Sequence, residues 1–140
     1  MERRGLIIRS VWAACLLVAG LNHARILIRH GLFWDYEGAS QASALYWSSL
    51  TLIDPMVAAL LFVRPRVGMP ATLVLIVTNV AHNLSVITHN SPEGAYVSAA
   101  FSSPQMMSQI GFLIFVIATW RLAWPGIGGD MRGPDRGTQG

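Results

Sequence analysis

Charged residues and cysteine are both scarce in this chain of 140 residues, and each shortage excludes classes of protein. Only 12% of the residues are charged, about half of the roughly 25% that soluble domains carry. The single cysteine, Cys15, has no second thiol in the chain, which excludes an internal pair of redox cysteines and a four-cysteine zinc site. Lysine is absent, and the ten basic residues, all arginine, are dispersed along the chain. We therefore expect no nucleic-acid partner.

Hydrophobic residues make up 53% of the chain, and they gather in four stretches that are long enough to cross a bilayer. We predict spans at about residues 6–28, 42–63, 67–88 and 105–124. At about 1.5 Å per residue, these lengths suit a hydrocarbon core of about 30 Å. Residues 1–124 are therefore predicted to form one all-α domain, a membrane four-helix bundle with up-down-up-down topology. Residues 125–140, rich in glycine and proline, are predicted to form a disordered cytoplasmic tail.

The arginines predict how the bundle is oriented. Four crossings place both termini and the short basic turn at residues 64–68 on one side, together with eight of the ten arginines. Only Arg25 and Arg29 fall on the other side. Because positive loops stay in the cytoplasm, we predict cytoplasmic N- and C-termini. The lack of lysine is typical of a G+C-rich bacterial genome, so the predicted location is the bacterial inner membrane, with the lipid bilayer as the first partner.

Polar residues inside the third span share one helical face. Asn79, His82 and Asn83 are spaced i, i+3, i+4, so their side chains point the same way. An unsatisfied polar group facing lipid costs several kcal/mol, and the face must therefore look into the bundle. It either hydrogen-bonds neighbouring helices, at about 0.6 kcal/mol per pair, or forms part of a ligand, metal or proton site.

Asp54 lies near the middle of the second span and directly before Pro55. An unpaired carboxylate at this depth takes up a proton or finds a cation. The alternative is a proline kink in which Asp54 bonds a neighbouring amide. Counting from the turn that joins the second and third spans, Asn79 is at the closest depth, so we expect a direct Asp54–Asn79 pair.

The first and fourth spans add polar groups at the outer level. Asn22, His23 and Arg25 end the first span, and Gln109 lies in the fourth. Arg25 requires an anion, or it snorkels to a lipid phosphate. Since the inner half is lined by apolar residues, the pattern predicts a polar pocket open to the extracytoplasmic side and floored by Asp54.

Three functions are consistent with this pocket. The first is binding of a small polar or amphipathic ligand, such as a quinone head group, in a transport or redox accessory role; His82, Asn79 and Asn83 would bind it and Asp54 would hold a proton. The second is a single b-type haem between His23 and His82, which lie at similar depth on different spans. The third is a structural subunit that forms a homo-oligomer or joins a partner membrane subunit. No catalytic triad or H-E-x-x-H motif is present, so we expect a binding role rather than catalysis.

The first span ends in Val18-Ala19-Gly20-Leu21-Asn22-His23, and a basic turn closes the hairpin that follows. In this layout, over residues 6–124, the chain resembles the small bacterial four-span inner-membrane proteins of the DoxX-like group. The Asp54-Pro55 and Ala81-His82-Asn83 pairings are similar to those of other small bacterial membrane proteins. Both resemblances imply a bacterial inner-membrane protein with four spans, and neither supplies functional residues.

Overall fold

Helices make up most of the described part of the chain. The computed structural model describes residues 2–32, 34, 36 and 38–124, and the tail predicted to be disordered lies outside them. Four long helices and one short helix are formed: α1 Glu2–His30, α2 Gln41–Val63, α3 Pro65–Asn90, α4 Tyr96–Ser102 and α5 Pro104–Ala123. The described residues contain no strand, and the predicted all-α fold class is confirmed.

The four long helices, α1, α2, α3 and α5, are each long and apolar enough to cross a membrane. They match the predicted spans and extend past most of the predicted ends by one to four residues, except that α5 ends at Ala123, one residue before the predicted end. The short helix α4 was not predicted; its seven residues lie between the third and fourth predicted spans. Ser103 separates it from α5 and accepts a hydrogen bond from the backbone N–H of Met106 as an N-cap.

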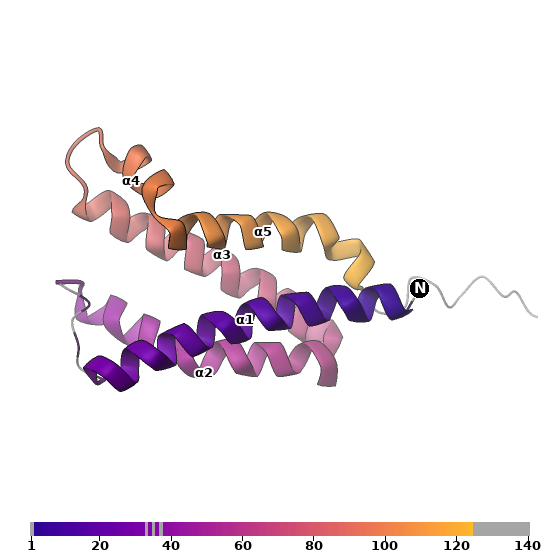
Figure 1. The fold of residues 1–140 in the computed structure, drawn as a ribbon. Coiled ribbons are helices and arrows are strands. Elements are labelled where there is room, and N and C mark those ends of the chain that lie inside the picture. The colour runs from indigo at the N-terminus through magenta and orange to yellow at the C-terminus, as the bar shows by residue number, and fades with distance from the viewer. Residues whose placement is uncertain (1, 33, 35, 37, 125–140) are drawn as a thin grey trace, which may run out of the picture.

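The long helices form a ring in the order α1, α2, α3, α5. Each packs against the two helices beside it in this order, α5 closes the ring against α1, and α4 covers α3 and α5. Helices α1 and α3 therefore lie on a diagonal and make no helix-to-helix contact. Figure 1 shows α1 and α5 close together at the N-terminal end of α1 and diverging toward the end where α4 lies.

The α2–α3 hairpin is tight because a single residue, Arg64, separates the two helices. Its backbone N–H donates to the carbonyl of Leu60, and its own carbonyl accepts from Gly68, which continues the helical bonding across the joint. A Cβ on Gly68 would lie 2.5 Å from backbone atoms of Leu60 and Leu61. Only glycine allows this approach of two backbones.

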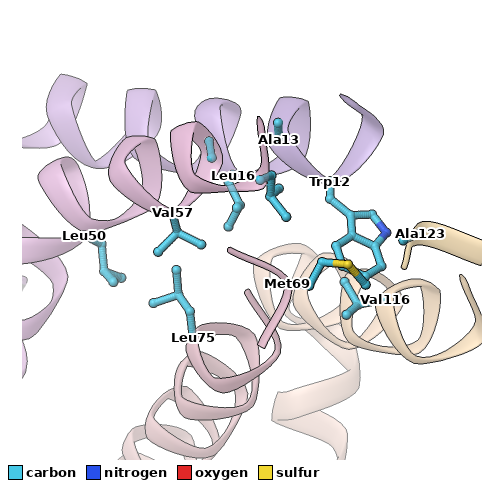
Figure 2. Packing of buried hydrophobic residues seen from close by; sticks show 11 residues of the cluster. Trp12, Ala13, Leu16, Leu50, Val57, Met69, Leu75, Val116 and Ala123 are labelled. Carbon is cyan, nitrogen blue, oxygen red and sulfur yellow. The ribbon is translucent and has the colours of Figure 1, made fainter. Parts of the chain in front are cut away.

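Apolar packing is concentrated at the end of the bundle where α1 begins and α5 ends. Trp12, Leu61, Met69 and Val116, one from each long helix, are fully buried there, and Figure 2 shows Trp12 beside Met69 and Val116. Arg9 donates from its guanidinium to the carbonyl of Leu61, which supplies a partner to the last turn of α2. Apolar packing therefore fills this half of the bundle, and the polar side chains of the predicted site lie in the other half.

Candidate functional site

A cavity of about 690 Å³ lies where α1 and α5 diverge. All four long helices contribute to its wall, with α1 and α5 supplying most of it. The lining residues are Ala14, Cys15, Leu16, Val18, Ala19, Asn22, His23, Asp54, Ile76, Asn79, Gln105, Ser108, Gln109 and Phe112.

The cavity is closed at one end by contacts between α1 and α5. The indole N–H of Trp12 donates to the Thr119 hydroxyl at 3.1 Å, and the Trp12 ring stacks on Trp120 with 6.2 Å between ring centroids. About two turns nearer the start of α1, Gly5 lies so close to α5 that a Cβ there would be 3.1 Å from the carbonyl oxygen of Leu122. These contacts hold the two helices together at the end of the bundle where the chain begins.

Beyond these contacts the cavity has a mouth along the side of the bundle. Cys15, Val18 and Asn22 on α1 line the cavity and are exposed, Val18 by 69%, as are Gln105 and Ser108 on α5. These residues lie between two helices that are apolar enough to span a membrane. The mouth therefore lies between the exposed sides of two candidate membrane helices, and the predicted opening toward the extracytoplasmic solution stays a prediction.

The lining changes from apolar to polar along the helices. Trp12 lies opposite Thr119, and α1 and α5 run antiparallel, so counting along both helices places Asn22 level with Gln109. The residues nearer the closed end are apolar or weakly polar: Ala14, Cys15, Leu16, Val18, Ala19, Ile76 and Phe112. A molecule in this cavity meets amide and imidazole groups at one end and hydrocarbon at the other.

Two of the polar lining residues are buried without partners. Asp54 is 0% exposed and His23 is 6% exposed. Neither carboxylate oxygen of Asp54, nor Nδ1 of His23, has a hydrogen-bond partner among the described residues. Gly20 brings α1 and α2 together here, since a Cβ on it would lie 3.1 Å from Pro55 and 3.2 Å from the Asp54 Cβ. A buried polar group without a partner costs about 1–3 kcal/mol, which makes the pair a candidate for ligand contact.

The amides of α3 take part in hydrogen bonds between helices. The Trp47 indole donates to Asn83 Oδ1 at 2.9 Å, and Asn83 Nδ2 donates to Gln109 Oε1 at 2.8 Å. The Tyr46 hydroxyl donates to Asn79 Oδ1. The chain Trp47–Asn83–Gln109 thus ties α2, α3 and α5 together. The prediction that this face of α3 looks into the bundle is confirmed for both asparagines.

His82 contacts aromatic rings instead of the cavity. Its ring lies 4.5 Å from that of Tyr46 and 5.5 Å from that of Trp47, between centroids. The Nε2 atom is buried without a partner among the described residues. The ring is therefore packed between α2 and α3, and it does not line the cavity.

The structure brings together five of the eight predicted site residues. Asn22, His23, Asp54, Asn79 and Gln109 line one cavity. Asn83 reaches the cavity only through its bond to Gln109, and His82 and the exposed Arg25 do not line it.

The expected direct pair of Asp54 with Asn79 is wrong. Asn79 accepts its hydrogen bond from Tyr46, and Asp54 has no partner among the described residues. The reason is that the Tyr46 hydroxyl, which lies on α2 about two turns before Asp54, is closer in depth to Asn79.

For the haem alternative, the two predicted ligands lie on diagonal helices. His23 on α1 faces the cavity, whereas His82 on α3 lies against two aromatic rings. The described residues contain no group of three or more His, Cys, Asp or Glu side chains that could hold a metal ion.

Sequence reasoning missed Phe112 and Cys15 as lining residues and Tyr46 and Trp47 as amide partners. A signal for Phe112 was present, since it follows Gln105, Ser108 and Gln109 at helical spacing. Tyr46 and Trp47 carried no distinct signal, because aromatic residues near the end of a span are also typical of the membrane interface.

Comparison with known proteins adds no assignment. The chain matches no protein family, and no curated protein and no solved structure is significantly similar to it.

Proposed function

We propose that this protein binds an amphipathic small molecule that enters its cavity from the bilayer. The observation that carries the proposal is the cavity between α1 and α5, whose mouth lies between the exposed sides of two candidate membrane helices and whose wall is polar at one end only. Its volume of about 690 Å³ falls within the roughly 300–1,000 Å³ of small-molecule sites.

Selectivity in such a site comes from the polar end. A hydrocarbon tail gains little by leaving lipid for an apolar protein wall, because lipid tails are equally apolar. The head group gains hydrogen bonds that the bilayer core does not offer. Asn22, His23, Asn79 and Gln109 therefore select the ligand, and the apolar wall around Val18 accommodates its chain.

The proposal includes the orientation in the membrane. Eight of the ten arginines fall on the side of the termini, which favours cytoplasmic termini in a bacterial inner membrane. The polar end of the cavity, at the level of Asn22 and Gln109, would then lie in the extracytoplasmic half. A ligand held there has the orientation of a lipid in the outer leaflet.

Cys15 offers a direct test, because the only thiol of the chain lines the cavity. The protein would be placed in nanodiscs and labelled with a membrane-permeant pyrene maleimide, with and without native membrane lipid extract. We expect bound extract components to slow the labelling of Cys15. After the Cys15→Ala change, a cysteine placed at Val74, which is exposed on α3 and does not line the cavity, should be labelled equally with and without extract.

A second arm uses matched changes from alanine to phenylalanine. Ala19→Phe fills the cavity wall, whereas Ala59→Phe lies on an exposed position of α2 outside the lining. Components that co-purify with the wild type and the Ala59→Phe variant, identified by mass spectrometry, should be lost from Ala19→Phe. If all three proteins carry the same lipids and Cys15 labelling never changes, the cavity is only a gap in packing, and the structural-subunit function is favoured instead.

A further inference from the structure

The hydrogen bonds behind the cavity fix which atom of Gln109 faces it. An indole N–H can only donate, so the Asn83 atom 2.9 Å from Trp47 Nε1 is the oxygen. The other end of this amide is then the nitrogen, and it donates to Gln109 at 2.8 Å. The Gln109 atom that accepts is therefore Oε1, which leaves the two N–H bonds of Nε2 without a partner among the described residues. Gln109 lines the cavity, so this donor is available to a ligand.

Asn79 repeats the arrangement on the adjacent wall. Its Oδ1 accepts from the Tyr46 hydroxyl, and its Nδ2 donates no hydrogen bond within the part of the chain that the structure describes. The residue lines the cavity and is only 6% exposed. Two amides on different helices thus use their oxygens for bonds between helices and present N–H groups to the cavity.

The charged side chains of the cavity wall further restrict the chemical class of the ligand. None of the described residues that line the cavity is an arginine, and the chain has no lysine, so an anionic head would meet no permanent positive charge, and the only basic lining group among these residues is the His23 imidazole. The only acidic lining residue is Asp54, fully buried on α2. The amide N–H groups carry partial positive charge and disfavour a cation at the level where the head would lie.

We propose that the ligand has a neutral head group with carbonyl-type hydrogen-bond acceptors, such as a cyclic amide, ketone or ester, on a hydrocarbon chain. The carbonyl oxygen accepts from Gln109 Nε2 and Asn79 Nδ2, and Phe112 borders the head on the apolar side. This inference rests on the proposed binding function and adds the chemistry of the head. A cationic head drawn to Asp54 is the competing outcome.

The test uses probes that share one chain and differ in the head. N-dodecyl-2-pyrrolidone offers a carbonyl acceptor without charge or donor, dodecyltrimethylammonium offers a cation without an acceptor, and dodecanoate offers an anion. Each is titrated into nanodiscs while protection of Cys15 from maleimide is measured, and empty nanodiscs correct for partitioning. We expect the pyrrolidone to protect at the lowest concentration, by at least about tenfold, which corresponds to one hydrogen bond.

Three variants separate recognition from folding. Gln109→Met removes the donor at similar side-chain length and should weaken pyrrolidone binding about tenfold. Trp47→Phe leaves Gln109 in place but removes the donor that fixes its orientation, so a smaller loss is expected. Gln41→Met, at the exposed start of α2 outside the cavity, should bind as the wild type does. Helix content by circular dichroism shows that each variant is folded.

The outcomes decide between this inference and the binding function itself. If the ammonium probe protects best and Asp54→Asn abolishes that protection, the cavity takes a cation and the inference is overturned while binding stands. If pyrrolidone binds equally to the wild type and to the Gln109→Met and Trp47→Phe variants, the amide donors do not recognise it and the inference is also overturned. If the native lipid extract protects Cys15 but none of these probes does, the head-group inference is overturned while binding stands; if neither the extract nor any probe protects Cys15, both proposals fall.

Discussion

Replacing Gly68 by alanine should separate α2 from α3. The added Cβ would lie 2.5 Å from backbone atoms of Leu60 and Leu61, whereas ordinary contacts begin at 3.4 Å. Helix α3 must therefore move away from α2 by about 0.9 Å, the difference between 3.4 Å and 2.5 Å. Because Arg64 alone joins the helices, no loop can absorb the shift. Overpacking of this kind costs about 1–3 kcal/mol.

The shift has a second consequence further along the hairpin. The hydrogen bond from Trp47 to Asn83 measures 2.9 Å. Lengthening this distance by about 0.9 Å would break the hydrogen bond, because the two atoms would then lie too far apart. Gly68→Ala should thus lower both the free energy of unfolding and the affinity for the proposed ligand.

The assay for Gly68→Ala is unfolding in mixed micelles of dodecyl maltoside and dodecyl sulfate, followed by circular dichroism. Gly111→Ala is the matched control, since nothing lies within 4 Å of a Cβ at Gly111; it should be neutral, or more stable by up to about 1 kcal/mol. Equal stabilities of the two variants would refute the close approach of α2 and α3.

The remaining predictions concern the network, the closed end and the topology. Asn83→Leu leaves the Trp47 indole and the Gln109 amide without their hydrogen-bond partner, so it should lower the free energy of unfolding by about 1–3 kcal/mol. Ser85→Leu, at an exposed position, should change the free energy of unfolding by less than about 0.5 kcal/mol. Equal losses in the two variants would contradict the network. Trp12→Phe removes the bond to the α5 hydroxyl and also part of a fully buried ring, so it should cost more than the about 0.6 kcal/mol of the bond alone; a double-mutant cycle with Thr119→Val isolates the bond, and no coupling would count against it. In a cysteine-free chain in intact cells, an impermeant maleimide should label Glu93→Cys but not Arg66→Cys, and the reverse result would invert the proposed orientation.

The sequence alone determined the four spans and the hairpin. Apolar runs of this length can satisfy their backbone in lipid only as helices, and a one-residue joint leaves α2 and α3 no arrangement except an antiparallel pair. Helical periodicity also placed Asn79 and Asn83 on one inward face, because the spacing i, i+4 is local geometry.

The pairing of the inward polar groups was decided by the tertiary structure. Periodicity gives the face of a residue but not the neighbour across the interface. Asn83 and Asn79 found aromatic donors of α2, whereas Asp54 and His23 were left without partners among the described residues. Sequence reasoning grouped all four as one site, although Asn83 bonds neighbouring helices through both ends of its amide, whereas the other three keep polar atoms that can contact a ligand.

The cavity itself also came from the tertiary structure. Its existence depends on α1 and α5 meeting at Trp12 and Thr119 and then diverging. The divergence follows from the angles at which the helices pack. Large side chains set these angles where they separate two helices, as the stacked indoles of Trp12 and Trp120 do. Small residues set them where two helices come close, as Gly20 does against Pro55. Such angles arise from contacts between residues far apart in the chain, which no local pattern encodes.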